Sequence, residues 1–344
     1  MGQMYVAGDW LASDVRLNHY CLDLSSDSAR SIDDIGPLRP FARKLKRSIV
    51  FLFLSSFWLL TSSWEYAQQL DDINTSLMRC TFRISGPSNK TPGEISYGSG
   101  FLVGVPTEPN SVRSWYVFVT AAHILRDIEG NTATIDLRRK NGDGTYSDYP
   151  YLFQIRNNFI NLYETSPEAD VAVAFINLPF AAEVPSPVPV SFLVSDERIS
   201  QVELHPGDNL FVLGFPLYTS LNTFPVLRSA ILSSYPLVPA KTVKHFYLNF
   251  RVFPENSGGP VYFDYLGRFY ISRNTTDFAN RQVGILGLVS NQLSSSASGM
   301  DESLDIAEVV PAIYITEAIS KLGGHPAPAN TILPVSSVKS SHSK

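Results

Sequence analysis

From residue 75 onward, short runs of β-branched, aromatic and aliphatic residues alternate with clusters of Gly, Pro, Asn and Asp. Runs of this kind, bounded by turn-forming residues, are typical of strands in an all-β protein. Two similar groups of strands predict two antiparallel β-barrels. The predicted strands are 78–85, 95–105, 115–122, 132–138, 149–162 and 171–176 in the first group, and 202–204, 209–214, 226–235, 246–253, 260–263, 269–272 and 283–289 in the second.

The segments between and after these groups differ from them in composition. Residues 178–189 contain four prolines, and because proline cannot donate a hydrogen bond within a sheet, this stretch predicts a linker. The predicted first barrel therefore spans residues 75–178, and the second unit spans residues 190–322. Apolar residues at helical spacing, followed by two glycines, predict a helix at 311–322. The Pro-, Ala- and Ser-rich residues 325–344 predict a disordered tail.

Composition and charge narrow the range of functions. The chain has 344 residues, 44% of them apolar, and a net charge of -5, values typical of a globular protein. Its basic residues are scattered apart from one N-terminal cluster, so we expect no nucleic-acid partner. The two cysteines, Cys21 and Cys80, provide neither a disulfide framework nor a zinc-binding spacing. We therefore expect no metal ion and no cofactor.

That basic cluster, at residues 43–47, precedes an uncharged run at 48–64. The run is slightly shorter than the roughly 20 apolar residues of a membrane-spanning helix. With the small polar residues that follow, it predicts a signal peptide or an uncleaved membrane anchor at residues 43–67. Because the unpatterned residues 1–42 come first, a signal peptide would require a translation start further along the chain. The predicted location is periplasmic or secreted, or membrane-anchored with the folded part outside the cytoplasm.

Three residues have the types and contexts needed for an activated serine nucleophile. A serine hydroxyl becomes nucleophilic when an imidazole takes its proton, and a carboxylate sets the tautomer of that imidazole. His123 follows an apolar strand, Asp170 precedes an apolar strand, and Ser257 is followed by two glycines that allow a close approach to the backbone. Taken singly, each has an ordinary structural interpretation; taken together, they predict a nucleophilic site.

Three sequence blocks around these residues resemble those of a known family. They are YGSGFLV at 97–103, TAAH at 120–123 and NSGGP at 256–260. In this order they resemble the chymotrypsin-like (trypsin-like) serine peptidases, and most of all the bacterial HtrA-like branch. The resemblance covers about residues 75–322 and implies two six-stranded antiparallel β-barrels with a C-terminal helix and an active site in the cleft between the barrels. We expect no PDZ domain after that helix.

The same resemblance implies roles for individual residues. His123 would be the general base, Asp170 the orienting acid and Ser257 the nucleophile. The spacings of 47 and 87 residues between them are similar to those of the family. The oxyanion hole would use the backbone N–H groups of Ser257 and Glu255. The base of the primary substrate pocket would be Arg251, where a cation would favour acidic side chains; alternatively, Arg251 is a surface residue.

Two positions depart from the family pattern. The family usually has glycine at the position of Glu255, so a side chain there predicts a slowed oxyanion hole, unless it points into solvent and leaves the backbone unaffected. Secreted digestive members have Asp at the position of Asn256, where it pairs with a newly cut N-terminal ammonium. The neutral Asn256 predicts activity that does not require this ion pair.

The sequence therefore supports one leading function and two alternatives. The first is an exported serine endopeptidase that acts on protein or peptide substrates and meets the membrane only during export or through an uncleaved anchor. The second is a binding or scaffold protein with a protease fold and an impaired oxyanion hole. The third is a membrane-tethered enzyme, which would stay with membranes after salt washing.

Overall fold

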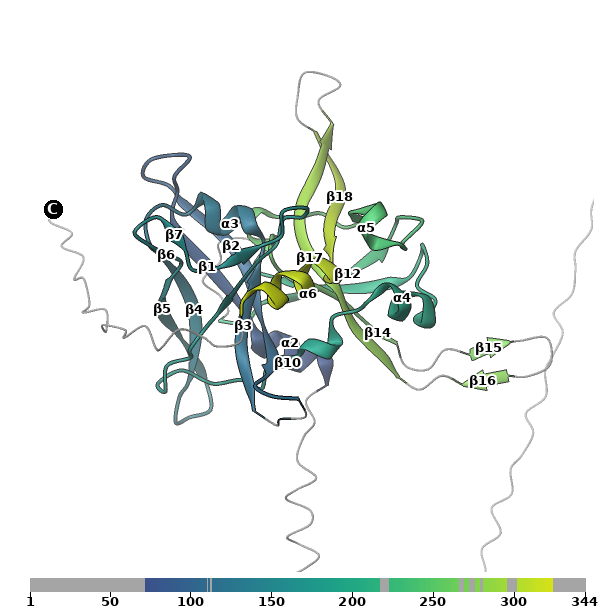
Figure 1. Ribbon diagram of the computed structural model, residues 1–344, viewed down its shortest axis with the longest axis horizontal. Helices are drawn as coiled ribbons and strands as arrows, with labels where there is room; N and C mark the ends of the chain where they lie inside the picture. Colours follow the sequence, from purple (N-terminus) through teal and green to yellow (C-terminus); the bar gives the residue numbers. More distant parts are fainter. Residues whose placement is uncertain are drawn as a thin grey trace, which may run out of the picture. The chain divides into compact units, whose positions relative to one another are not determined.

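The computed structural model describes residues 72–109, 111, 113–216, 223–265, 269–271, 276–278, 281–295 and 302–323. The segments predicted at 1–42, 43–67 and 325–344 lie outside the described residues. Within the described ranges, no helix is both long and apolar enough to span a membrane. Most of the regular structure in the described residues is β, and Figure 1 shows how the strands group into a sheet and a barrel.

The first group of strands forms an eight-stranded sheet in the order β5-β4-β1-β2-β3-β9-β8, with β10 paired to β2. All its ladders are antiparallel except the β10–β2 pair. Because β10 lies within the predicted linker, that segment joins the sheet as well as leading away from it. The strands are β1 (Thr81–Pro87), β2 (Ile95–Pro106), β3 (Ser114–Thr120), β4 (Thr132–Lys140), β5 (Tyr146–Gln154), β8 (Glu164–Thr165), β9 (Ala172–Phe175) and β10 (Val188–Pro189).

The second group closes into a six-stranded barrel in the order β11-β12-β13-β18-β17-β14. Every ladder of this barrel is antiparallel. The sheet, the barrel and the C-terminal helix confirm the predicted all-β fold class and fit the chymotrypsin-like architecture. The barrel strands are β11 (Asn209–Gly214), β12 (Val226–Leu232), β13 (Phe246–Asn249), β14 (Pro260–Tyr265), β17 (Gln282–Ser295) and β18 (Glu302–Pro311).

The remaining elements are short. Two small hairpins are formed by β6 (Arg156–Asn157) with β7 (Ile160–Asn161), and by β15 (Phe269–Ile271) with β16 (Thr276–Phe278). The helices are α2 (Ile73–Cys80), α3 (Ala122–Asp127), α4 (Asp196–Val202), α5 (Ala240–Val243) and α6 (Ala312–Lys321), with 3₁₀-helices η1 (Val190–Phe192) and η2 (Pro254–Asn256).

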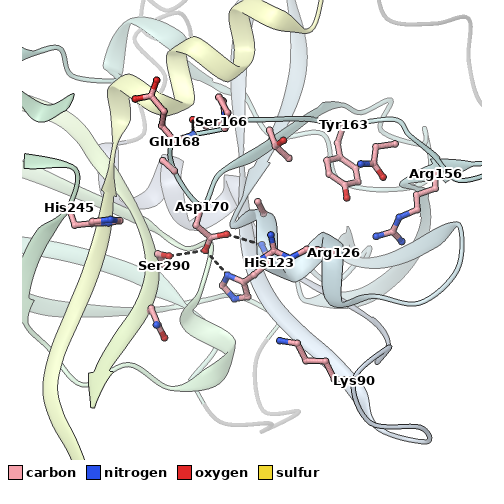
Figure 2. A pocket seen from close by; sticks show the side chains of 16 residues that line it. Lys90, His123, Arg126, Arg156, Tyr163, Ser166, Glu168, Asp170, His245 and Ser290 are labelled. Carbon is pink, nitrogen blue, oxygen red and sulfur yellow. Dashed lines mark hydrogen bonds and ion pairs between the residues drawn. The ribbon is translucent and has the colours of Figure 1, made fainter. Parts of the chain in front are cut away.

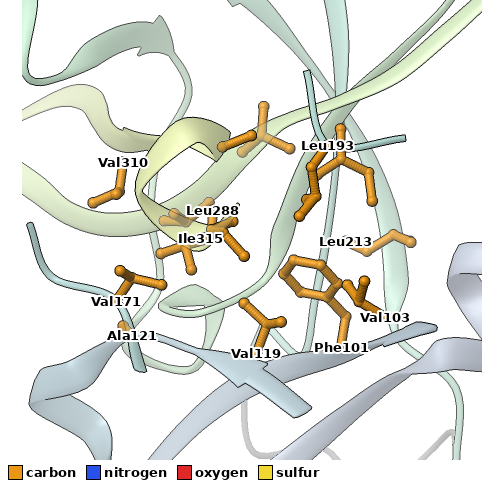
Figure 3. Close-up of a cluster of buried hydrophobic side chains, with 14 of the residues drawn as sticks. Phe101, Val103, Val119, Ala121, Val171, Leu193, Leu213, Leu288, Val310 and Ile315 are labelled. Atoms are coloured by element: carbon orange, nitrogen blue, oxygen red, sulfur yellow. The ribbon is translucent and has the colours of Figure 1, made fainter. Parts of the chain in front are cut away.

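The C-terminal helix α6 packs against strands of both the sheet and the barrel. It contacts β8 and β9 of the sheet as well as β17 and β18 of the barrel. In Figure 3, Ile315 of α6 lies near Val171 and Leu288. Val171 directly precedes β9, and Leu288 belongs to β17. All three side chains are fully buried, and each such side chain contributes about 1.5–3 kcal/mol relative to its exposed state. The helix therefore joins the sheet to the barrel.

Two expected strands have a different structure. Of residues 202–204, predicted as a strand, Val202 ends helix α4 and the other two follow it. Ser195 accepts a hydrogen bond from the Arg198 N–H at the start of that helix, and two acidic residues occupy its first turn, a strong combination of N-terminal helix signals. The predicted strand 149–162 ends early, because Asn158 and Phe159 adopt φ values of 46° and 71° and turn the chain into the β6–β7 hairpin.

Candidate active site

His123 and Asp170 make two hydrogen bonds with each other. His123 is the second residue of α3, which begins directly after β3. Its ring Nδ1 lies 2.6 Å from Asp170 Oδ2, and its backbone N–H donates to Asp170 Oδ1 at 2.8 Å. Figure 2 shows both contacts. The carboxylate therefore holds both the ring and the backbone of His123, and its contact at Nδ1 directs the ring proton to that nitrogen.

The surroundings of Asp170 favour its ionised form. Burial raises the pKa of Asp170. The hydrogen bond and charge of His123 and the hydroxyl of Ser290 lower this pKa by a larger amount, so it lies below the usual range. The ionised carboxylate therefore stabilises the folded state at neutral pH. That contribution is lost only as the pH falls through the lowered pKa, since the depressed value belongs to the folded state.

Ser290 connects this pair to Ser257. The Ser290 hydroxyl donates to Asp170 Oδ2 at 2.8 Å, and the Ser290 carbonyl accepts from Ser257 Oγ at 3.0 Å. Within the described residues, that carbonyl is the partner of the Ser257 hydroxyl, and no hydrogen bond joins Ser257 to His123. Ser290 was not predicted from the sequence. It lies within β17, and its only sequence signal is a polar residue after an apolar run, followed by Asn291 and Gln292; such a pattern is too common to single out.

The backbone after Ser257 is held by the sheet and requires glycine. Ser99 of β2 donates its N–H to the Ser257 carbonyl at 2.8 Å, and Gly258 donates to Val289 at 2.7 Å. Gly258 has φ = 86°, and a Cβ there would lie 2.1 Å from the Ser99 carbonyl oxygen. A side chain is excluded by both the dihedral angle and the close approach. This explains physically the first glycine of the NSGGP block.

Glu255 is buried, which argues against a side chain that points into solvent. It is 7% exposed, and its Oε2 has no hydrogen-bond partner within the described residues. Burial raises the pKa of Glu255, while the nearby Arg83 opposes the rise. The neighbouring Asn256 is also buried. Within the described residues, neither the oxygen nor the nitrogen of its side-chain amide has a hydrogen-bond partner. Unpaired polar groups are costly in a folded interior, and here they lie directly before the candidate nucleophile.

The turn that contains Glu255 is a 3₁₀-helix. Asn256 donates its N–H to Phe253, and Ser99 Oγ donates to the Glu255 carbonyl at 2.6 Å. A 3₁₀-helix directs backbone N–H groups into its own turn, and here the N–H of Asn256 bonds to Phe253. The expected donors of the oxyanion hole, the N–H groups of Glu255 and Ser257, flank Asn256. Glu255 itself has a negative φ, which imposes no strain on it.

Arg251, the expected base of the substrate pocket, lies at the surface. Its side chain is 62% exposed and its Nε lies 3.6 Å from Asp305 Oδ1. It is not among the residues that line the cavity beside His123. The assignment of Arg251 to a pocket stays a prediction.

A cavity of about 930 Å³ opens beside His123 and Asp170. In the described part of the chain, no group of three or more His, Cys, Asp or Glu side chains could hold a metal ion. Ser257 does not line this cavity. The cavity therefore borders His123 and Asp170 but not the candidate nucleophile. The lining residues are Lys90, Ala122, His123, Arg126, Arg156, Asn161, Tyr163, residues 165–170, His245, Ser290 and Asn291.

Comparisons with known proteins give structural matches only. No family model matches the chain, and no curated protein matches it. The active form of the Rv3671c protease from M. tuberculosis is 17% identical, with a TM-score of 0.38, over 75% of this chain and 87% of that one. The protease Anisep from Arthrobacter nicotinovorans is 11% identical, with a TM-score of 0.41, over 73% of this chain and 98% of that one. At these values, the assignment of chemistry depends on the geometry of the site.

Proposed function

We propose that the protein is an exported serine endopeptidase, with Ser257 as nucleophile, His123 as general base and Asp170 as orienting acid. The observation that carries the proposal is the two-point contact of Asp170 with His123, extended through Ser290 to Ser257. An ionised carboxylate on Nδ1–H leaves Nε2 free to accept a proton, which is the arrangement that a serine nucleophile requires.

In the proposed reaction, the Ser257 hydroxyl turns from the Ser290 carbonyl to His123 as substrate binds. Catalytic hydrogen bonds are often absent or long before substrate arrives. Ser257 Oγ then bonds to the peptide carbonyl carbon while His123 Nε2 takes the hydroxyl proton. The C–N bond breaks, and the amine leaves with the proton from His123. Water, deprotonated by His123, cleaves the acyl ester and restores Ser257.

The export part of the proposal depends on residues 43–67, whose basic cluster and apolar run have the order of a signal peptide. The finer resemblance to HtrA-like enzymes depends on the three sequence blocks. Protein or peptide substrates in the periplasm or outside the cell follow from this proposal. Native protein that stays with membranes after salt washing would instead favour the anchored alternative.

A second function is favoured by the 3₁₀ turn before Ser257. With Glu255 buried in the 3₁₀ turn directly before Ser257, this conformation would leave the oxyanion hole incomplete. A hole donor is worth about 10²–10³ in rate. A protein that never left this state would bind peptides without cleaving them efficiently.

Labelling with a fluorophosphonate probe separates the two functions, because the probe reacts only with an activated serine. We expect the folded wild type to label slowly at Ser257 and Ser257→Ala not to label. Glu255→Gly should label at least about tenfold faster, since glycine permits backbone dihedrals that open the turn. The gain should shrink as the pH falls, because the raised pKa of Glu255 means that its carboxylate loses its charge at a higher pH than an ordinary Glu.

The comparison of Glu255→Gly with wild type at each pH removes the pH effects that are common to both proteins. Folded wild type that fails to label while Glu255→Gly labels would favour the binding protein. Failure of both to label would overturn the peptidase proposal. Equal labelling rates would show that the turn does not limit reactivity.

A further inference from the structure

The cavity beside His123 has an uneven distribution of charge. In Figure 2, Lys90, Arg126 and Arg156 lie on one side of His123, while Glu168 lies on the other side of Asp170. Cations on one wall and an anion on the opposite wall orient a charged ligand that enters between them. Which of the cations is available to a ligand depends on the contacts that each makes within the protein.

Two of the three cations already have partners in the protein. Lys90 Nζ lies 2.6 Å from Asp127 Oδ2. The Arg156 guanidinium donates to the carbonyls of Leu125, Ile128 and Gly130 at 2.6–2.9 Å. Arg156 therefore holds the end of α3 and the loop after it in place. Neither cation can turn toward a ligand without losing these contacts.

Arg126 differs from both. It is exposed, and within the described residues its guanidinium has no hydrogen-bond or ion-pair partner; its backbone carbonyl accepts from Asn89. It lies three residues after His123 on α3, so the two side chains share one face of the helix. A guanidinium offers several N–H donors in a planar fork that matches a carboxylate.

We propose that Arg126 selects substrates with an Asp or Glu side chain next to the scissile bond, which it binds in this cavity. The inference rests on the proposed peptidase function and adds the substrate class. Glu168 on the opposite wall would repel an acidic group placed beside it. The cavity therefore selects the orientation of the peptide as well as the charge of its side chain. Arg126 is then a determinant of specificity and takes no part in the bond-making steps.

The test measures binding without turnover. Alanine hexapeptides that carry one Asp or one Asn at each position in turn are titrated against the Ser257→Ala variant by fluorescence anisotropy. We expect Asp to bind about fivefold more tightly than Asn at one position, the size of an exposed charge pair. This ratio should shrink between 0.05 M and 0.5 M salt, because salt screens exposed charges. Adding Arg126→Glu should abolish or reverse it.

The matched control is Arg113→Glu in the same Ser257→Ala background. Arg113 is exposed and does not line the cavity, so its replacement changes the net charge equally and should leave the Asp preference intact. The inference is overturned if no Asp peptide binds more tightly than its Asn counterpart, or if the preference survives Arg126→Glu. Because Ser257 labelling is a separate measurement, an inert protein that still prefers Asp would reject the peptidase function alone.

Discussion

Replacing Asp170 by Asn is expected to lower kcat on peptide substrates on the order of 10⁴-fold while the protein stays folded. In the wild type, Asp170 Oδ1 accepts a hydrogen bond from the His123 backbone N–H. Oδ2 accepts hydrogen bonds from the His123 Nδ1–H and the Ser290 hydroxyl. Asparagine has only one acceptor oxygen. If that oxygen stays on the backbone N–H, its amide group donates to Nδ1, and the ring proton moves to Nε2.

A His123 ring protonated at Nε2 cannot accept the proton of Ser257. If the amide turns the other way, two N–H donors face each other at the His123 backbone. That clash disfavours the second orientation, so the first one predominates and kcat falls with little change in folding. Thermal unfolding of the variant checks that the fold is intact.

Ser290→Ala is the matched control for this prediction. It removes one hydroxyl donor from Asp170 and leaves the carboxylate and both His123 contacts in place. The loss should be within about tenfold, as expected from one hydrogen bond. A kcat for Asp170→Asn within tenfold of wild type would contradict the role proposed for Asp170.

Replacing Arg138 by Met is expected to lower the free energy of unfolding by about 3–5 kcal/mol, the cost of breaking a buried ionic cluster. Arg138 is 1% exposed, and burial lowers its pKa to about 10, a shift that nearby Glu183 opposes. Its guanidinium donates to the carbonyls of Thr81, Thr223 and Arg79. These acceptors come from strand β1 of the sheet, from the connection between β11 and β12 of the barrel, and from helix α2.

Two aromatic rings enclose the same guanidinium. The Phe82 and Phe224 ring centroids lie 4.3 and 4.4 Å from it. Methionine fills part of this space but supplies no donor, so three carbonyls lose a partner and Glu183 loses one of its two nearby cations, keeping Arg79. Urea denaturation measures the loss as a lower midpoint with an unchanged slope.

The neighbouring Arg139→Met is the control for this variant. Arg139 is exposed, donates to Ala181 and lies 4.9 Å from the ring centroid of Tyr149. Its replacement should change stability by less than about 1 kcal/mol. Equal effects of the two replacements would contradict a structural role for the buried position.

The sequence predicted the strands, the helix and the site residues that depend on a local pattern of residue types. Alternating apolar runs gave most strands of the sheet and barrel, and helical spacing gave α6 within one residue at each end. The TAAH and NSGGP blocks led to residues that lie around one site, because each block needs particular residue types for local reasons. Gly258 is an example, since its dihedral angle and its approach to Ser99 both exclude a side chain.

What the sequence did not predict depends on contacts between distant residues. Ser290 matters only because the fold brings it to Asp170, 120 residues earlier in the chain. Strand β18 was missed because its inward-facing residues include Ala307 among acidic neighbours, which weakens the apolar pattern. The burial of Glu255 depends on the packing of the barrel against β1 and β2, and no local pattern encodes it.

Ser99 joins the two halves of the chain at the candidate site. Through its hydroxyl and N–H, this residue of the first sheet holds the backbone of Glu255 and Ser257, which belong to the barrel. His123 and Asp170 come from the first half of the chain, whereas Ser257 and Ser290 come from the second. A chain with only its first half made therefore contains the proposed base without the proposed nucleophile, so we expect reactivity to begin only when both halves have been synthesised and have docked.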